Sequence, residues 1–132
     1  MGTRMIGLVA CCKTKLPEPT RAEELYCSPL FRKARAYCLA RYRHWFILSA
    51  KYGLVDPGQV ITPYDCTLLD QNKQARTEWG QLVIRQLVAL GLAEETFAAH
   101  AGKVYVAPLS SKLRVVTPLA GLGIGQQMAW YM

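Results

Sequence analysis

The sequence predicts a single α/β domain over residues 1–132, with a mainly parallel sheet of about four strands and helices on both faces. Short apolar runs alternate four times with segments of helical periodicity, which is the pattern of strand–helix–strand units. Hydrophobic residues make up 52% of the chain, enough to bury the core of one ordinary domain. No internal repeat, low-complexity tract or long linker marks off a second unit.

The N-terminal half contains two predicted strands and the helix between them. Residues 5–10 form a short apolar run with Ile and Val that ends at a polar turn, which is typical of a buried strand. Ser28 and Pro29 predict a helix start, because serine accepts a backbone N–H there and proline has no N–H to leave unpaired. This helix is expected to reach about Tyr42, and residues 45–48 form the second strand.

The C-terminal half is predicted to continue the alternation. Asp70 is the expected N-cap of a helix with a continuous apolar stripe that ends near Gly91. Residues 96–100 form the third strand, and residues 113–117, which are rich in Val, form the fourth. Between these strands a helix starts at "GKVYVAPL", and Pro108 is expected to kink or end it. The segment "GLGIGQQMAWYM" begins as a glycine loop and finishes as a helix.

The loops that follow the four strands are expected to meet, because parallel strands end at the same edge of a sheet, where ligands usually bind. These loops read "CCKTK", "SAKYG", "AGK" and "PLAGLGIG", and they predict a cationic crevice with close backbone approach. We expect static phosphate binding by Lys13 and Lys15, whereas Lys51, at a sharp strand exit, is a candidate catalytic group. The other binding residues expected at this edge are Ser49, Tyr52, Lys103, Gly121, Gly123, Gly125 and Gln126.

Asp65 is a further candidate catalytic residue, in the stretch "PYD". Pro63 sets a turn, Tyr64 can stack on a base, and Asp65 can accept a proton or stabilise a developing cation. The alternative is a turn in which Asp65 hydrogen-bonds its own backbone. Tyr26 and Ser28 precede the first helix, where a phosphate would find free N–H groups, although a simple capping role for Ser28 explains the same residue.

Cys11 and Cys12 follow the first strand, and strand alternation sends their side chains to opposite faces. One is expected in the core, and Cys12 is the candidate catalytic thiol, because nearby lysines would favour its thiolate. Five cysteines without a C-x-x-C pair predict free thiols. His44 and His100 have no second ligand at a zinc spacing, and "GLGIG" is not a dinucleotide fingerprint, so neither a metal nor another cofactor is expected.

The net charge of +7 comes entirely from the N-terminal part of the chain. Residues 1–51 hold ten Lys or Arg against three Glu, whereas residues 52–132 hold six basic and six acidic residues. The asymmetry predicts a nucleic acid or nucleotide partner, with a generally basic surface as the alternative, and Arg32, Arg35 and Arg43 are expected to form one nucleic-acid face. No apolar run of membrane-spanning length and no signal peptide occurs, so we expect a cytoplasmic protein without a membrane partner.

Six segments support a family resemblance that spans nearly the whole chain: "CCKTK", "LYCSPLFRKA", "FILSAKYGLVDP", "PYDCTL", "AGKVY" and "PLAGLGIGQQMAW". They resemble a small uncharacterised family of bacterial and phage proteins, a domain of unknown function that is distantly similar to the YaaA peroxide-stress proteins. Cys12, Lys15, Tyr26 and Ser28 also resemble the cysteine, lysine, tyrosine and serine pattern of the catalytic domain of archaeosine synthase, which modifies a 7-deazaguanine base in tRNA. In that pattern the lysine and the tyrosine lie together, whereas residues 16–25 separate them here. Both similarities imply work on or near nucleic acid.

Charge, crevice and resemblance together predict a nucleobase- or nucleotide-directed enzyme that acts on nucleic acid, with the N-glycosidic bond as a candidate point of attack. Two alternatives stay open. A non-catalytic nucleic-acid-binding or stress-protection protein would need the basic arginine face but not Asp65. An enzyme on a small phosphorylated metabolite would need only the crevice.

Overall fold

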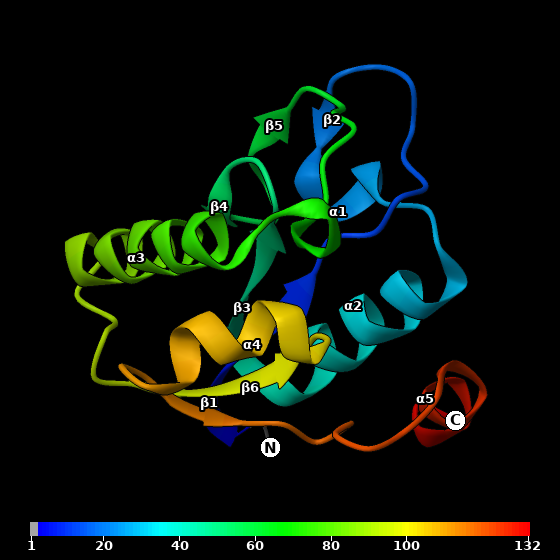
Figure 1. Ribbon diagram of the computed structural model, residues 1–132. Helices are drawn as coiled ribbons and strands as arrows, with labels where there is room; N and C mark the ends of the chain where they lie inside the picture. The colour runs from blue at the N-terminus through cyan, green and yellow to red at the C-terminus, as the bar shows by residue number, and fades with distance from the viewer. Residues whose placement is uncertain (1–2) are drawn as a thin grey trace.

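The longer strands of the chain form a five-stranded mixed sheet in the order β4-β3-β1-β6-β7 (Figure 1). The structure is a computed structural model and describes residues 3–132. Four of the strands run parallel, as the sequence predicts, and β4 is an antiparallel addition beside β3. A separate ribbon pairs β2 with β5. The strands are β1 Thr3–Ala10, β2 Thr20–Arg21, β3 Tyr42–Ser49, β4 Gly53–Val55, β5 Val60–Ile61, β6 Thr96–His100 and β7 Arg114–Val116.

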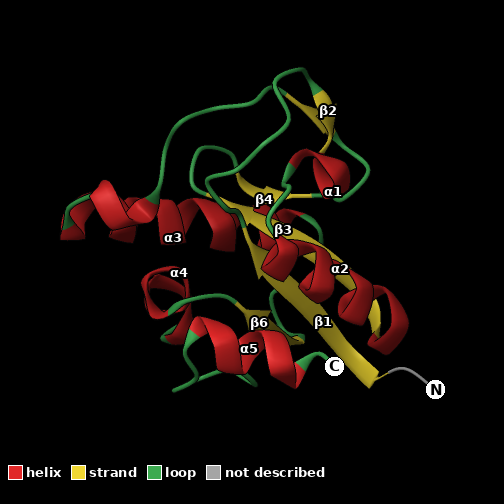
Figure 2. Cartoon of the chain, turned by 90° about the vertical axis from the view of Figure 1, so that its right-hand side faces the viewer, coloured by secondary structure: helices red, strands yellow, loops and turns green. Residues whose placement is uncertain are grey.

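Helices cover both faces of the sheet, which confirms the predicted fold class. Helices α3 and α4 pack on one face, and α1 and α2 pack on the other; Figure 2 shows α2 and α3 on opposite sides of the sheet. The short α5 contacts α2. Within residues 3–132, no helix is long and apolar enough to cross a membrane. The helices are α1 Ala22–Leu25, α2 Pro29–Arg41, α3 Lys73–Ala89, α4 Lys103–Ser110 and α5 Ile124–Trp130, with a 3₁₀ turn, η1, at Leu68–Asp70.

The central strands supply side chains to both hydrophobic cores. On β3, Phe46 and Leu48 point into the core under α3 and α4, whereas Trp45 and Ile47 point into the core under α1 and α2. A strand that is buried on both faces has no polar positions in its middle. This explains why the predicted second strand is a continuous apolar run rather than an alternating one.

Capping residues set the starts of the two longest helices. The N–H of Phe31 donates to the Oγ of Ser28 over 3.0 Å, so α2 begins where the sequence predicts. The predicted cap of α3 is wrong: Asp70 lies in η1, and Asn72 caps the helix by accepting the N–H of Ala75 at 2.8 Å. Asparagine and aspartate are equally good caps, so residue type alone cannot choose between the two positions.

Helices α3 and α4 approach each other closely at Gly80 and Pro108. Pro108 lies inside α4, which continues only as far as Ser110. A Cβ atom added at Gly80 would lie 2.7 Å from the Cβ of Pro108, so glycine is required on α3 at this crossing. The close contact fixes the axis of α4 against α3, and with it the position of the α4 N-terminus directly after β6.

Candidate functional site

The carboxyl edge is the edge of the sheet where the four parallel strands end, and it includes the loops that follow these strands. A groove of about 480 Å³ lies at this edge. Its walls come from the end of β1, the start of α2, the connection from β6 into α4, and the segment after β7 that includes α5. Its volume falls in the range of small-molecule sites. The lining side chains with polar or reactive atoms are Cys11, Cys12, Ser28, His100, Lys103, Tyr105, Gln127 and Tyr131.

Helices α2, α4 and α5 begin in the wall of this groove. Helix α4 starts at Lys103 with Gly102 as its N-cap, and no side chain caps it. The N-terminal N–H groups and the dipole of a helix favour a bound anion. At the start of α2, by contrast, Ser28 already accepts a backbone N–H, which is the capping role that the sequence left open.

The lysines predicted for the crevice lie at the carboxyl edge, but they do not all face one pocket. Lys103 lines the groove. The Nζ of Lys15 lies 4.5 Å from the ring centroid of Tyr64, and the Nζ of Lys51 lies 5.3 Å from that of Tyr52. Cation–π contacts therefore hold two of the lysines against aromatic rings. The ring of Tyr64, predicted to stack on a base, has an ammonium group over it.

Lys15 and Tyr26 lie side by side although residues 16–25 separate them in the sequence. The two residues pair through an isolated antiparallel bridge. The segment between them forms a closed loop that contains β2 and α1, and the N–H of Leu16 donates to the carbonyl oxygen of Leu25 at 2.9 Å. The fold thus brings together two predicted site residues that are separated in the sequence.

A partly buried chain of hydroxyl groups joins Ser49, Tyr64 and Tyr26. The Oγ of Ser49 donates to the hydroxyl of Tyr64 at 2.8 Å, and the hydroxyls of Tyr64 and Tyr26 lie 2.6 Å apart. Burial raises the pKa of both tyrosines well above the usual value, so both hydroxyls keep their protons near neutral pH. These groups can therefore donate hydrogen bonds but cannot act as bases.

Both adjacent thiols line the groove, so the predicted division into one core and one exposed cysteine is not observed. The Sγ of Cys11 lies 3.3 Å from the hydroxyl of Tyr105, and the Sγ of Cys12 donates to the carbonyl oxygen of Thr14 at 3.3 Å. Every cysteine is free, as predicted. Among the described residues, no group of three His, Cys, Asp or Glu side chains could hold a metal ion.

Several predicted residues lie outside the lining of the groove. Asp65 is exposed in the loop that follows β5. Gly121 lines a neighbouring cavity of about 440 Å³ together with Lys103. The N–H of Gly123 donates to the Oε1 of Gln126 at 3.0 Å, so these two residues cap α5. Lys13, Lys51 and Gly125 are also exposed and outside the lining of the groove.

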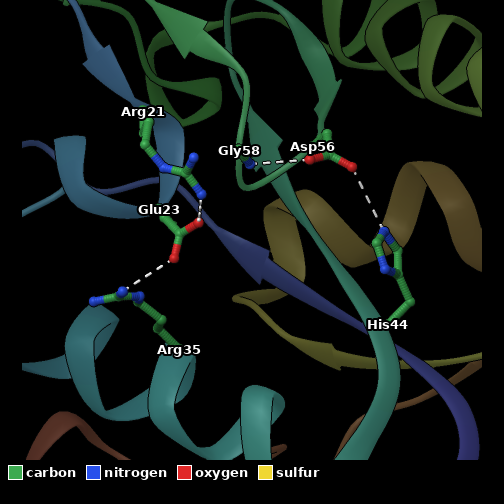
Figure 3. A network of polar contacts seen from close by, with 6 residues as sticks. All are labelled: Arg21, Glu23, Arg35, His44, Asp56 and Gly58. Carbon is green, nitrogen blue, oxygen red and sulfur yellow. Dashed lines mark hydrogen bonds and ion pairs between the residues drawn. The ribbon is translucent and has the colours of Figure 1, made fainter.

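The structure does not bring the three arginines of the predicted nucleic-acid face together. Arg35 on α2 donates to the carboxylate of Glu23 at 3.0 Å (Figure 3). Arg43 lies on β3, at the edge opposite the groove, and pairs with Glu95 at 2.5 Å. Arg32 is exposed on α2. Two of the three charges are therefore already paired with carboxylates.

His100 is a groove residue that the sequence does not single out. It ends β6 and is only 5% exposed. Its Nε2 lies 2.7 Å from the hydroxyl of Tyr42, and its Nδ1 lies 2.6 Å from the hydroxyl of Tyr131. Burial lowers the pKa of His100 to about 4, so the ring is neutral near pH 7. A histidine at the carboxyl end of a predicted strand is the one signal that could have indicated it.

The fold and the groove define a small α/β protein with a groove at the carboxyl edge of its sheet. Over residues 6–132 the chain matches the family of unknown function DUF6884, and it belongs to that family, which confirms the resemblance to a small uncharacterised family. It is 31% identical over 104 residues to the uncharacterized protein YfjM of Bacillus subtilis (strain 168), a match that covers 67% of this chain and 69% of that protein. No solved structure matches the chain significantly.

Proposed function

We propose that this protein binds a nucleobase or nucleotide of a nucleic acid in the carboxyl-edge groove and acts on the base or on its N-glycosidic bond. The supporting observation is that one groove combines an apolar wall, a helix N-terminus with a lysine, and two thiols. The apolar wall can hold a base, the helix N-terminus and its lysine can bind a phosphate, and a thiol can act as a nucleophile.

The apolar wall suits a flat heterocycle. It includes Leu30, Phe31, Leu119 and Ile124, which come from α2, from the segment after β7 and from the start of α5. A base that leaves its stack is usually held between such side chains, while polar groups read its edge. The amide of Gln127 also lines the groove and can donate to or accept from a base edge.

Basic groups outside the groove favour a nucleic acid over a small phosphorylated metabolite. Lys103 lines both the groove and a second cavity of about 500 Å³ between α3 and α4, where Lys73 and Arg76 join it. Lys13 and Lys51 are exposed at the same carboxyl edge. A free nucleotide needs one phosphate site, whereas a polymer can use all of these charges.

Two measurements test the proposal. Fluorescence anisotropy with a labelled single-stranded RNA 12-mer compares Lys103→Gln with Lys112→Gln, which removes the same charge at the other end of α4. We expect about a tenfold weaker complex for Lys103→Gln only, the loss of roughly one charge-assisted contact. Mass spectrometry of nucleosides from tRNA or DNA incubated with the protein then detects a released or altered base. Equal binding by both variants would refute the site, and binding without any altered base would favour a non-catalytic binder.

A further inference from the structure

Cys11 and Cys12 are consecutive residues in the wall of one groove, yet their sulfur atoms have different hydrogen-bond partners. The partner of Cys11 is the hydroxyl of Tyr105, and the partner of Cys12 is the carbonyl oxygen of Thr14, each at 3.3 Å. A cysteine attacks an electrophile as the thiolate and not as the thiol. The effect of each partner on the thiolate therefore decides which of the two cysteines is reactive.

Tyr105 favours the thiolate of Cys11. Burial raises the pKa of Tyr105 to about 12, whereas a thiol ordinarily ionises near pH 8.5. When Cys11 loses its proton, Tyr105 still has its own, so the contact becomes an O–H donor facing a negative sulfur. Hydrogen bonds to an ionised acceptor are about twice as strong as neutral ones. The contact is thus strengthened by ionisation.

The carbonyl group of Thr14 has the opposite effect on Cys12. A carbonyl oxygen can only accept, so its bond to Cys12 exists only while the sulfur has a proton. Ionisation of Cys12 would break the bond and leave a negative sulfur facing a carbonyl oxygen. This contact therefore gives a Cys12 thiolate no stabilisation.

The buried phenol of Tyr26 and the half-buried phenol of Tyr64 lie near Cys11 and do not oppose its ionisation. Burial is the main cause that raises the pKa of Tyr26 and Tyr64, and the charge of Cys11 raises the pKa of both further. Both tyrosines stay neutral and add no negative charge beside the sulfur. Cys11 is accordingly a partly exposed thiol among three protonated hydroxyls, in a groove that a ligand can enter.

We propose that Cys11 is the nucleophile of the groove and that the hydroxyl of Tyr105 stabilises its thiolate. The target class, an electrophilic ring carbon of a nucleobase, rests on the proposed function. The thiol proton goes to solvent, the sulfur forms an S–C bond to the carbon of a ring C=N bond, the π electron pair moves to the nitrogen, and that nitrogen takes a proton from solvent. The addition is balanced and needs no oxidant or reductant.

Alkylation by iodoacetamide at pH 7 tests the assignment without any substrate. Trypsin releases residues 5–13, a peptide that contains only these two cysteines, so Cys12→Ser reports Cys11 and Cys11→Ser reports Cys12. We expect labelling of Cys11 to be faster by about tenfold, because only its thiolate is stabilised. Equal labelling of the two cysteines, or faster labelling of Cys12, would overturn the proposal.

A variant of Tyr105 tests whether its hydroxyl stabilises the thiolate of Cys11. In the Cys12→Ser background, Tyr105→Phe should slow the labelling of Cys11 by roughly fivefold. Tyr37→Phe is the control and should leave the rate unchanged, because Tyr37 lies on α2 outside the lining of the groove. Cys38 is 0% exposed, so labelling of the tryptic peptide 36–41 would reveal any unfolding of a variant. An unchanged rate in folded Tyr105→Phe contradicts the role of this hydroxyl.

Protection by a ligand separates this inference from the proposed function. We expect a mixed-sequence RNA 12-mer to slow the labelling of Cys11 at saturating concentration. Fast labelling of Cys11 that neither RNA, DNA nor free nucleotides slow would refute a nucleobase as the target, and with it the proposed function. The assignment of Cys11 as the reactive thiol would then rest only on the labelling rates of Cys11 and Cys12.

Discussion

The Oγ of Ser49 donates a hydrogen bond to the hydroxyl of Tyr64 across 2.8 Å, which connects the carboxyl end of β3 to the loop that follows β5. The same Oγ accepts the backbone N–H groups of Lys51 and Tyr52 at 3.2 and 3.0 Å, and Ser49 is 0% exposed. Ser49 therefore connects three segments at the carboxyl edge of the sheet.

Replacement of Ser49 by alanine is expected to destabilise the fold. The change leaves the buried groups around Ser49 without their common partner, and such a loss lowers the free energy of unfolding by about 1–3 kcal/mol. Urea unfolding of Ser49→Ala measures it. Ser110→Ala is the control, because Ser110 is exposed and its Oγ donates only to the carbonyl oxygen of Ala107. A loss no larger than that of the control would show that the Ser49 contacts contribute little.

The buried His100 predicts a specific loss of stability in acid. Its pKa is about 4 in the folded protein against an ordinary value near 6.5, because burial disfavours the charged ring. The unfolded chain therefore binds a proton that the folded chain does not, so this contribution is present at pH 7 and is lost as pH falls from about 6.5 towards 4.

The measurement compares wild type with His100→Gln, which keeps hydrogen-bonding groups between Tyr42 and Tyr131 but cannot take up a proton. Between pH 7 and pH 4.5 the free energy of unfolding of wild type should fall by about 2 kcal/mol more than that of the variant. Subtracting the variant removes the contribution of the carboxylates, which titrate in both proteins. Identical falls would mean that His100 takes up its proton as readily in the folded protein as in the unfolded chain.

The variant Asp65→Asn tests whether Asp65 is a catalytic residue, as the sequence predicts, or only a turn residue. Asp65 is exposed and does not line the groove, so we expect the variant to bind the RNA 12-mer within about twofold of wild type and to unfold at the same urea concentration. If Asp65 instead contacts the reacting base when a ligand is bound, any turnover found for the wild type should fall by about two orders of magnitude in the variant.

The fold was predictable where local patterns and burial agree. The strand at residues 96–100 is predicted with its observed bounds, and Ser28 caps α2 as expected. The antiparallel β4 and the β2–β5 ribbon were not predicted, because strands of two or three residues are too short to show a period. Their existence depends on pairing with distant segments, which the sequence does not display.

The candidate site was predictable in outline only. The end of β1 and the start of α4 meet because parallel strands end together, so Cys12 and Lys103 could be placed at one edge from the sequence. The contact of Tyr105 with Cys11, 94 residues away, depends on how α4 packs on the sheet. Arg35 on α2 and Arg43 on β3 each pair with a carboxylate from another segment, which helical spacing cannot reveal.

The salt dependence of binding distinguishes the carboxyl edge from the opposite edge as the nucleic-acid surface. Lys13 and Lys51 lie on loops of the carboxyl edge and Lys103 begins α4 there, whereas Arg43 and Lys112 lie at the opposite edge. Each phosphate that a lysine neutralises on a single strand contributes about −0.7 to the slope of log affinity against log salt. The triple change Lys13→Gln, Lys51→Gln and Lys103→Gln should therefore make the slope for the RNA 12-mer shallower by about 2. The double change Arg43→Gln and Lys112→Gln should leave the slope unchanged. An equal effect of both sets of changes would indicate diffuse attraction by net charge. A slope near zero for the wild type would refute a nucleic-acid partner.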